Sequence, residues 1–342
     1  MVTHILGLCF LFWLKLYKSV FIHYKYIILT AEERTMNLAG IEKAFNKQLK
    51  ESPLPGSDVE WDKPFYIGDL EELRRQHLKW KTLLPRIEPF YAIKCNPDPI
   101  VAKFLASLGV GFDCASQSEI QQVLEMGLSE DQIVYSHPHK NPSSIQYAAQ
   151  NNVSLMSIDS ETELYKIKKL HPDAKLLLRV LVDDKYCAIP QGIKFGAMED
   201  DIEHLLSVSK ELKLNVVGAC FHVGSGCTNA EAYYDAVCRA RRVFDLAKSM
   251  DIEMNILNIG GGFNESGITE GGATFEKAAA VLGPAVDEMF PSNIRVIGEP
   301  GRFFVGSAFV LCVSVIGRQT VTPGADEMGK DVKSGKQSSK YM

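Results

Sequence analysis

The segment Pro89-Phe90-Tyr91-Ala92-Ile93-Lys94-Cys95-Asn96 contains a short apolar run that ends at a lysine. Runs of this kind are typical of buried strands, so Lys94 is expected where the strand leaves the core. Most lysines at strand ends are simply solvated. Partial desolvation would lower the pKa of the lysine, and the neutral amine could then form a Schiff base with an aldehyde. The chemical interpretation requires matching groups at other strand ends.

The same order of residues recurs from Phe90 onward: a short apolar run, a polar exit and an amphipathic stretch. Continuous apolar runs indicate strands that are buried on both faces, as in a parallel sheet. The predicted strands are Phe90–Ile93, Val110–Cys114, Ile133–Tyr135, Leu155–Ile158, Leu176–Val182, Val216–His222, Ile256–Ile259 and Arg295–Ile297. Eight β-α units over roughly two hundred residues predict an α/β fold, a closed (β/α)8 TIM-type barrel. An open doubly wound sheet is the alternative, but its glycine-rich dinucleotide turn is missing after the first strand.

Helix starts are expected directly after several of these strands. Pro99 suits the first turn of the helix that follows Lys94. The segments Ser116-Gln117-Ser118-Glu119 and Ser160-Glu161-Thr162-Glu163 match the capping-box pattern. The capping box explains Glu119 without any functional role.

The carboxyl ends of the strands carry the chemistry of such barrels. The polar groups at the predicted ends are Lys94, Asp113, His137, Asp159, Arg179, His222, the turn Gly260-Gly261-Gly262, Glu299 and Arg302. This set contains what a phosphorylated aldehyde cofactor needs. The sequence supports no role for His137 or Asp159.

A phosphate site is predicted after strands seven and eight. The Gly260-Gly261-Gly262 turn would let backbone N–H groups approach an anion, although three glycines alone are equally typical of a flexible turn. Barrels of this class commonly bind phosphate at this corner, and Arg302 adds a permanent cation there.

Four further strand-end residues each have both a chemical and a structural interpretation. Glu299 would pair with a pyridinium nitrogen, or else only with Arg302. His222 would lie flat against the cofactor ring, with Ser225 available to the phosphate; otherwise His222 is a satisfied core histidine. Asp113 and Arg179 would balance charge near the lysine and the ring, or else form a salt bridge at the rim.

Five motifs carry a family resemblance: Phe90-Tyr91-Ala92-Ile93-Lys94-Cys95-Asn96, Gly111-Phe112-Asp113-Cys114-Ala115-Ser116, His222-Val223-Gly224-Ser225-Gly226-Cys227, Gly260–Phe263 and Glu299-Pro300-Gly301-Arg302. In this order they closely resemble the ornithine decarboxylase family, pyridoxal-phosphate enzymes with an alanine-racemase-like barrel. The resemblance covers the chain from Trp61 to Val321. Diaminopimelate decarboxylases share part of the set, but the second and third motifs are more similar to the eukaryotic ornithine branch.

The resemblance implies a role for each matching residue. Lys94 would be the Schiff-base lysine and His222 the second catalytic residue, and no metal is expected. The implied pyridoxal 5'-phosphate contacts are Lys94, Asp113, Arg179, His222, Ser225, Gly260, Gly261, Gly262, Glu299, Gly301 and Arg302.

The implied activity is decarboxylation of ornithine to putrescine in polyamine biosynthesis, by a cytoplasmic homodimer. The alternative is a non-catalytic regulator similar to the antizyme inhibitors, which would bind an antizyme-like protein. Those inhibitors lose residues that match Asp113, Arg179 and Arg302, and this chain has all three.

The composition is ordinary for a soluble globular protein. Apolar residues make up 46% and charged residues 23% of the 342 residues, and the formal net charge of −5 gives no indication of nucleic-acid binding. The eight cysteines form no C-x-x-C pair, which favours reduced cytosolic thiols over disulfides or a zinc site.

The predicted organisation has five parts. An atypical leader spans 1–35, where the apolar runs are too short to cross a bilayer but a signal anchor remains an alternative. A lead-in segment (36–89), the barrel (90–302) and the start of a β-domain (303–321) follow. The polar tail at 322–342 is predicted to be disordered. The family's C-terminal cysteine, aspartates and tyrosine have no counterpart, so we expect a truncated form with doubtful dimerisation and activity.

Overall fold

The computed structural model describes residues 25–29, 38–51, 64–264, 273–313, 318–321 and 338–341. The chain forms two compact units. One consists of Asp69–Ala308, and the other combines Met1–Gly68 with Phe309–Met342. The predicted barrel range, 90–302, lies entirely within the first of these units.

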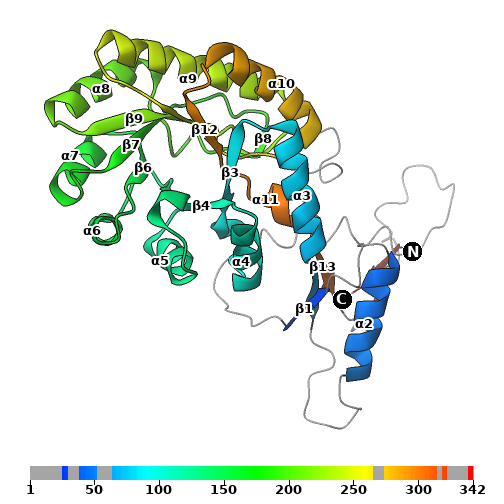
Figure 1. Cartoon of the computed structure of the whole chain (residues 1–342). Helices are drawn as coiled ribbons and strands as arrows, with labels where there is room; N and C mark the ends of the chain where they lie inside the picture. Colours follow the sequence, from blue (N-terminus) through cyan, green and yellow to red (C-terminus); the bar gives the residue numbers. More distant parts are fainter. Residues whose placement is uncertain are drawn as a thin grey trace. The chain divides into compact units, whose positions relative to one another are not determined.

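Within Asp69–Ala308, eight described parallel strands close into a barrel in the order β11-β12-β3-β4-β5-β6-β7-β9 (Figure 1). The strands are β3 (Ile87–Ala92), β4 (Gly111–Cys114), β5 (Ile133–Tyr135), β6 (Leu155–Ile158), β7 (Lys175–Arg179), β9 (Asn215–Cys220), β11 (Ile256–Asn258) and β12 (Arg295–Gly298). The predicted (β/α)8 fold is confirmed, and every predicted strand is present. Strand β3 begins three residues earlier than predicted and ends at Ala92, so Lys94 lies in the 3₁₀ turn η2 (Ile93–Cys95).

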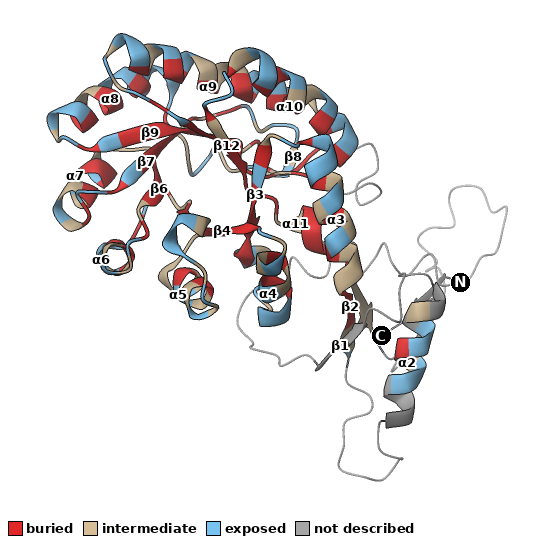
Figure 2. Ribbon diagram, in the orientation of Figure 1, coloured by how far each residue is buried: buried red, intermediate tan, exposed pale blue. Residues whose placement is uncertain are grey.

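Helices surround the strands, and the buried residues concentrate on the strands and on the helix faces that pack against them (Figure 2). The helical elements are α3 (Leu70–Leu83), α4 (Pro99–Ser107), α5 (Gln117–Glu125), η3 (Glu130–Gln132), α6 (Pro142–Gln150), α7 (Glu161–Leu170), η4 (Glu199–Asp201), α8 (Ile202–Glu211), α9 (Glu231–Ser249), α10 (Phe275–Met289) and α11 (Arg302–Val305). Pro99 occupies the first turn of α4 as predicted, after an Asp98 cap whose Oδ1 accepts from Ile100 N at 2.8 Å. Among the described helices, none combines the length and apolar character that a membrane crossing requires.

The two predicted capping boxes have different outcomes. Ser116 caps α5 by accepting from Glu119 N, but the Glu119 carboxylate accepts from Ala115 N at 2.6 Å. At α7 the prediction is wrong, because Ser160 makes no side-chain cap. Glu163 instead forms a fully buried ion pair with Lys140, at 2.8 Å. A charge-assisted contact is stronger than a hydrogen bond to a neutral backbone N–H, so the Glu163 carboxylate is more stable against Lys140 than in a capping box.

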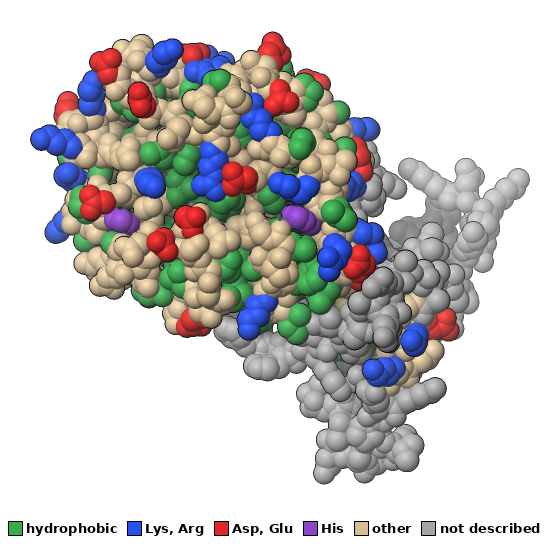
Figure 3. Space-filling view, in the orientation of Figure 1, with side chains coloured by type: hydrophobic (Ala, Val, Ile, Leu, Met, Phe, Trp, Pro, Cys, Tyr) green, Lys and Arg blue, Asp and Glu red, His purple; other side chains and the backbone are tan. Residues whose placement is uncertain are grey.

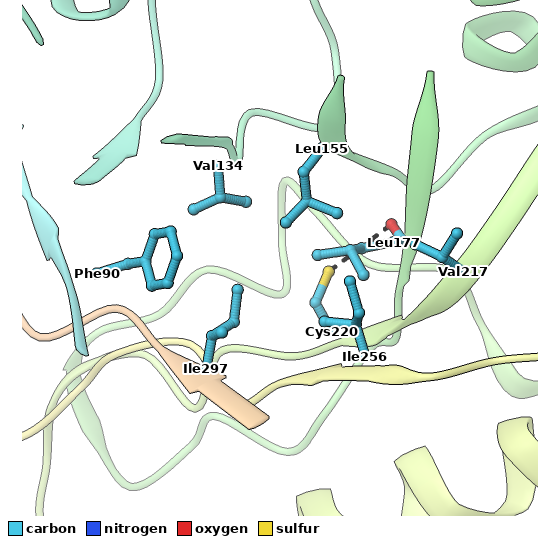
Figure 4. Packing of buried hydrophobic residues seen from close by; sticks show 8 residues of the cluster. All are labelled: Phe90, Val134, Leu155, Leu177, Val217, Cys220, Ile256 and Ile297. Carbon is cyan, nitrogen blue, oxygen red and sulfur yellow. Dashed lines mark hydrogen bonds between the residues drawn. The ribbon is translucent and has the colours of Figure 1, made fainter. Parts of the chain in front are cut away.

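The barrel interior is filled by side chains, as is usual for this fold. Eight of them converge inside the strands in Figure 4: Phe90, Val134, Leu155, Leu177, Val217, Cys220, Ile256 and Ile297. Helix α3 adds an aromatic layer, in which the Trp80 indole donates to Ile87 O at 2.8 Å and stacks on Phe275. This packed core fixes the strand ends that carry the polar groups.

Acidic and basic side chains alternate over the face of the barrel drawn in Figure 3. Nucleic-acid binding generally needs a clustered basic surface, and this face has charges of both signs.

The other unit contains helix α2 (Leu38–Glu51) and the sheet β1-β2-β13, with β1 (Lys25–Leu29), β2 (Phe65–Asp69) and β13 (Phe309–Cys312). Ala44 and Ile67 form its small described core. Strand β14 (Arg318–Val321) pairs antiparallel with β15 (Ser338–Tyr341). Ser338–Tyr341 therefore form a strand within the segment 322–342, where disorder is predicted. The rest of the predicted tail at 322–342, and the predicted leader at 1–35 except β1, lie outside the described residues.

Candidate active site

Lys94 lies at the carboxyl end of β3, where η2 directs its amine toward the neighbouring strand β4. The amine forms an ion pair with Oδ2 of Asp113, a β4 residue whose side chain is buried. The other carboxylate oxygen of Asp113 accepts a hydrogen bond from Ser136, which follows β5. Groups from three adjacent strand ends are thereby connected through one carboxylate.

The electrostatic environment of Lys94 differs from the predicted one. Burial lowers the pKa of the Lys94 ammonium, but the carboxylates of Asp113, Glu299 and Glu119 raise it, and the net pKa is above the ordinary value. The expectation of a lowered lysine pKa is therefore wrong, because it neglected carboxylates that are distant in sequence. About half of the Lys94 side chain (49%) is exposed, so the amine remains accessible to an incoming group.

Glu299 follows strand β12 and is 9% exposed. Its Oε1 accepts a hydrogen bond from Asn258 Nδ2 at 2.7 Å. Burial and the nearby Asp113 carboxylate raise the pKa of Glu299 to about 7, although Lys94, Asn258 and Arg179 oppose this shift. A carboxyl group that titrates near neutrality is well suited to share a proton with a ring nitrogen.

His222 lies two residues beyond β9, at the start of a tight glycine-containing turn. Its Nδ1 accepts from Gly224 N at 2.9 Å. Burial, followed by the charges of Arg179 and Lys94, lowers the pKa of His222 to about 3. The imidazole is therefore neutral at physiological pH, with its hydrogen on Nε2. A Cβ at Gly261 would lie 3.1 Å from Nε2, so the ring lies close to the glycine turn after β11.

The residues predicted to form a phosphate corner lie close together. Ser225 opens the short strand β10 (Ser225–Cys227), which pairs with β8 (Cys187–Ile189), and its hydroxyl accepts from Arg302 Nη2 at 3.1 Å. Gly260 and Gly262 both have positive φ angles, +63° and +96°. A Cβ on Gly262 would lie 2.5 Å from Gly224 O, so the turn requires glycine there. A hydroxyl, a guanidinium and an unobstructed glycine turn are the donors that a phosphate group needs.

Gly301 lies between β12 and α11, directly before Arg302. A Cβ there would lie 3.2 Å from the Cβ atoms of Ala92 and Cys95. Glycine at 301 therefore allows the Arg302 segment to approach the chain around Lys94 closely.

Arg179 ends strand β7, and its guanidinium lies 5.0 Å from the ring centroid of Phe195. The described ion pair of Asp113 is with Lys94 rather than with Arg179, the partner in the alternative interpretation. His137 and Asp159, to which no role could be assigned from the sequence, both support this region. The His137 ring packs edge-on against Phe195, and Asp159 accepts from Gly196 N at 2.8 Å.

Sequence reasoning missed two residues of the site, Ser136 and Asn258. Ser136 directly follows β5, whereas Asn258 is the last residue of β11 and directly precedes Ile259 and the glycine turn. An asparagine that interrupts an apolar run was the available signal. Glu119, assigned to capping alone, contributes to the charge around Lys94, and burial raises its own pKa.

Comparison with known proteins agrees with this geometry. The model of the pyridoxal-dependent decarboxylase family, pyridoxal binding domain, matches residues 70–306. Ornithine decarboxylase of Mus musculus is 45% identical over 268 residues, which cover 77% of this chain and 58% of that protein. Antizyme inhibitor 2 of Xenopus laevis is 43% identical over 274 residues, covering 79% of this chain and 60% of that protein.

Among solved structures, the arginine decarboxylase of Paramecium bursaria Chlorella virus superposes with a TM-score of 0.76 at 36% identity. The match covers 82% of this chain and 73% of the viral one. The chain thus spans somewhat more than half the length of the curated relatives it matches. With the family model covering most of the barrel unit, the chain belongs to the pyridoxal-dependent decarboxylase family.

Proposed function

We propose that the barrel binds pyridoxal phosphate and that the protein decarboxylates an amino acid, ornithine. The observation that carries the proposal is the convergence of Lys94, Glu299 and neutral His222 near the phosphate corner of Ser225 and Arg302. These groups match the aldehyde, the ring nitrogen, the ring face and the phosphate of that cofactor.

The proposal assigns a task to each residue. Lys94 would hold the cofactor covalently, while His222 would lie against its ring without adding a charge. Ser225, Arg302 and the backbone of Gly260–Gly262 would bind the phosphate, with Gly301 allowing the close approach of Arg302. When bound, pyridoxal phosphate supplies an electron-withdrawing ring that stabilises the carbanion left by departing CO2.

Two carboxylates would manage protons at defined atoms. Lys94 must lose a proton before its amine can react, and the Asp113 carboxylate, in contact with the amine through Oδ2, would hold that proton on Lys94 until the cofactor arrives. Ser136 would stabilise the charge on the other Asp113 oxygen. Glu299, with a pKa of about 7, would keep a proton on the ring nitrogen. Arg179 would keep the local charge balanced, since it favours ionised Glu299 and neutral His222.

Ornithine is proposed as the substrate because curated relatives named ornithine decarboxylase match this chain at 45% and 44% identity. Decarboxylation would yield putrescine, the first step toward polyamines. We further propose that the protein is a cytoplasmic homodimer that can bind an antizyme-like protein. The seven described cysteines are free thiols, which supports a reducing compartment such as the cytoplasm. The similarity to antizyme inhibitor 2 keeps a non-catalytic regulator as the alternative.

Release of CO2 from carboxyl-labelled ornithine separates the two functions. The purified chain is assayed with excess pyridoxal phosphate beside a Lys94→Ala variant, with lysine and arginine as competing substrates. A decarboxylase releases CO2 from ornithine faster than from the other two, and Lys94→Ala abolishes the release. Release no faster than that of Lys94→Ala from any substrate would contradict the proposal and favour the regulator.

A further inference from the structure

Asn258, the last residue of β11, has no part in the roles assigned above, yet it is almost completely buried among them. Its side chain is 1% exposed. Nδ2 donates to Glu299 Oε1 at 2.7 Å, and Oδ1 accepts from Gly260 N at 2.9 Å. One side chain therefore connects the proposed partner of the ring nitrogen with the proposed phosphate turn.

A backbone contact connects the same two segments. Glu299 N donates to Gly260 O at 2.6 Å, which ties the end of β12 to the turn after β11. The amide of Asn258 adds a second connection, which requires one donor and one acceptor on the same side chain. An aspartate could accept from Gly260 N but, when ionised, could not donate to Glu299. An aliphatic residue could do neither.

We propose that Asn258 is a positioning residue for the cofactor site: it fixes Glu299 Oε1 against the glycine turn and thereby leaves the second carboxylate oxygen to the ring nitrogen. The inference rests on the proposed function, because it assigns the cofactor's ring and phosphate to Glu299 and Gly260. Because one amide makes both contacts, the position of Glu299 and that of the Gly260 turn depend on each other.

The charges around Glu299 determine what the loss of this amide would do. Asp113 on β4 disfavours the ionised carboxylate, whereas Lys94 on η2 and Arg179 on β7 favour it. The Asn258 N–H also favours ionisation. A hydrogen bond to a charged group corresponds to about one to two pH units, so its loss would raise the pKa of Glu299 well above 7. At pH 7 the ionised fraction would fall by about five- to fiftyfold.

Asn258→Asp keeps the shape and the acceptor for Gly260 N and removes the donor, but it also adds a carboxylate beside Glu299. Asn258→Leu, which removes the donor without adding a charge, is therefore measured beside it. Asn151→Asp, in which the lost donor served the backbone carbonyl of Tyr147 on α6, is the matched control. In cofactor-free protein carrying ¹³C-labelled glutamate carboxyls, Glu299 is followed by NMR through its pH titration. Its signal is assigned by its absence in Glu299→Gln. Affinity for pyridoxal phosphate is then measured by equilibrium dialysis at pH 7 and pH 9.

The inference expects a Glu299 titration midpoint raised by at least one pH unit in both Asn258→Asp and Asn258→Leu and unchanged in Asn151→Asp. It also expects cofactor affinity reduced fivefold or more at pH 7, with recovery toward the parent value at pH 9, as Glu299 ionises. An unchanged midpoint, or an equal loss of affinity at both pH values, would overturn the inference and leave Asn258 as a purely structural tie. The NMR titration requires no cofactor, so failure of the parent chain to bind pyridoxal phosphate would refute the proposed function separately.

Discussion

Replacing Glu299 with glutamine should make the cofactor-free protein relatively more stable as the pH rises. The folded state holds the pKa of Glu299 at about 7, raised from the ordinary 4.5 mainly by burial. Between these two pH values the folded state keeps a proton that the unfolded state has released. The contribution of Glu299 to the free energy of unfolding of the parent therefore falls with increasing pH in this window. Glutamine does not ionise, so the variant lacks this fall.

The size of the effect follows from the width of the window. A pKa shift of one unit corresponds to about 1.4 kcal/mol. Raising the pKa of Glu299 to about 7 therefore lowers the free energy of unfolding of the parent by about 3 kcal/mol above neutral pH. His222 acts in the opposite direction, because its folded pKa of about 3 makes the protein gain stability as pH rises toward 6.5. The His222 contribution is common to the parent and the variant, so it cancels when the two are compared.

Urea unfolding, followed by circular dichroism at pH 4.5, 6 and 8, measures the difference directly. We expect Glu299→Gln to gain about 3 kcal/mol relative to the parent between pH 4.5 and 8. Glu253→Gln, at an exposed position, is the control and should stay within about 0.5 kcal/mol of the parent throughout. A difference between parent and Glu299→Gln that does not change with pH would refute the account of this buried carboxyl.

Three further outcomes are expected. Arg302→Ala should weaken pyridoxal phosphate binding by about ten- to a hundredfold in equilibrium dialysis, the value of a charge-assisted contact of about 1.5–3 kcal/mol; unchanged affinity would remove Arg302 from the phosphate site. Asp113→Asn should lower the pKa of Lys94, because Asp113 raises that pKa more than any other carboxylate. The variant should then capture the cofactor faster than the parent below pH 9, and an unaltered pH profile of capture would contradict this. Lys140→Met should cost about 3–5 kcal/mol in urea unfolding, because it leaves buried Glu163 without its buried partner, and a loss below about 1 kcal/mol would show that Lys166 suffices.

The barrel could be predicted because its information is local. Each strand is a short apolar run, such as Leu155–Ile158, and each exit is polar, so periodicity and length identify the units without any tertiary contact. The ends of parallel strands necessarily meet at one edge of the barrel, which brought Lys94, Asp113 and Glu299 together in the prediction.

The details that failed depend on partners distant in the chain. The direction of the Lys94 pKa shift is decided by carboxylates on other segments. The Glu163 carboxylate, predicted to serve a local cap, instead pairs with Lys140, 23 residues earlier. Asn258 was overlooked for a related reason. Its two contacts, with Gly260 and with Glu299, exist only once β11 and β12 lie side by side.

Covalent capture at Lys94 tests the central claim most directly. The purified chain is mixed with pyridoxal phosphate, reduced with borohydride, digested and mapped by mass spectrometry, with Lys94→Ala treated in parallel. The account expects the reduced cofactor on Lys94 alone and no stoichiometric labelling of Lys94→Ala. Stoichiometric labelling at another lysine, or equal labelling of Lys94→Ala, would contradict the assignment of this strand end as the cofactor site.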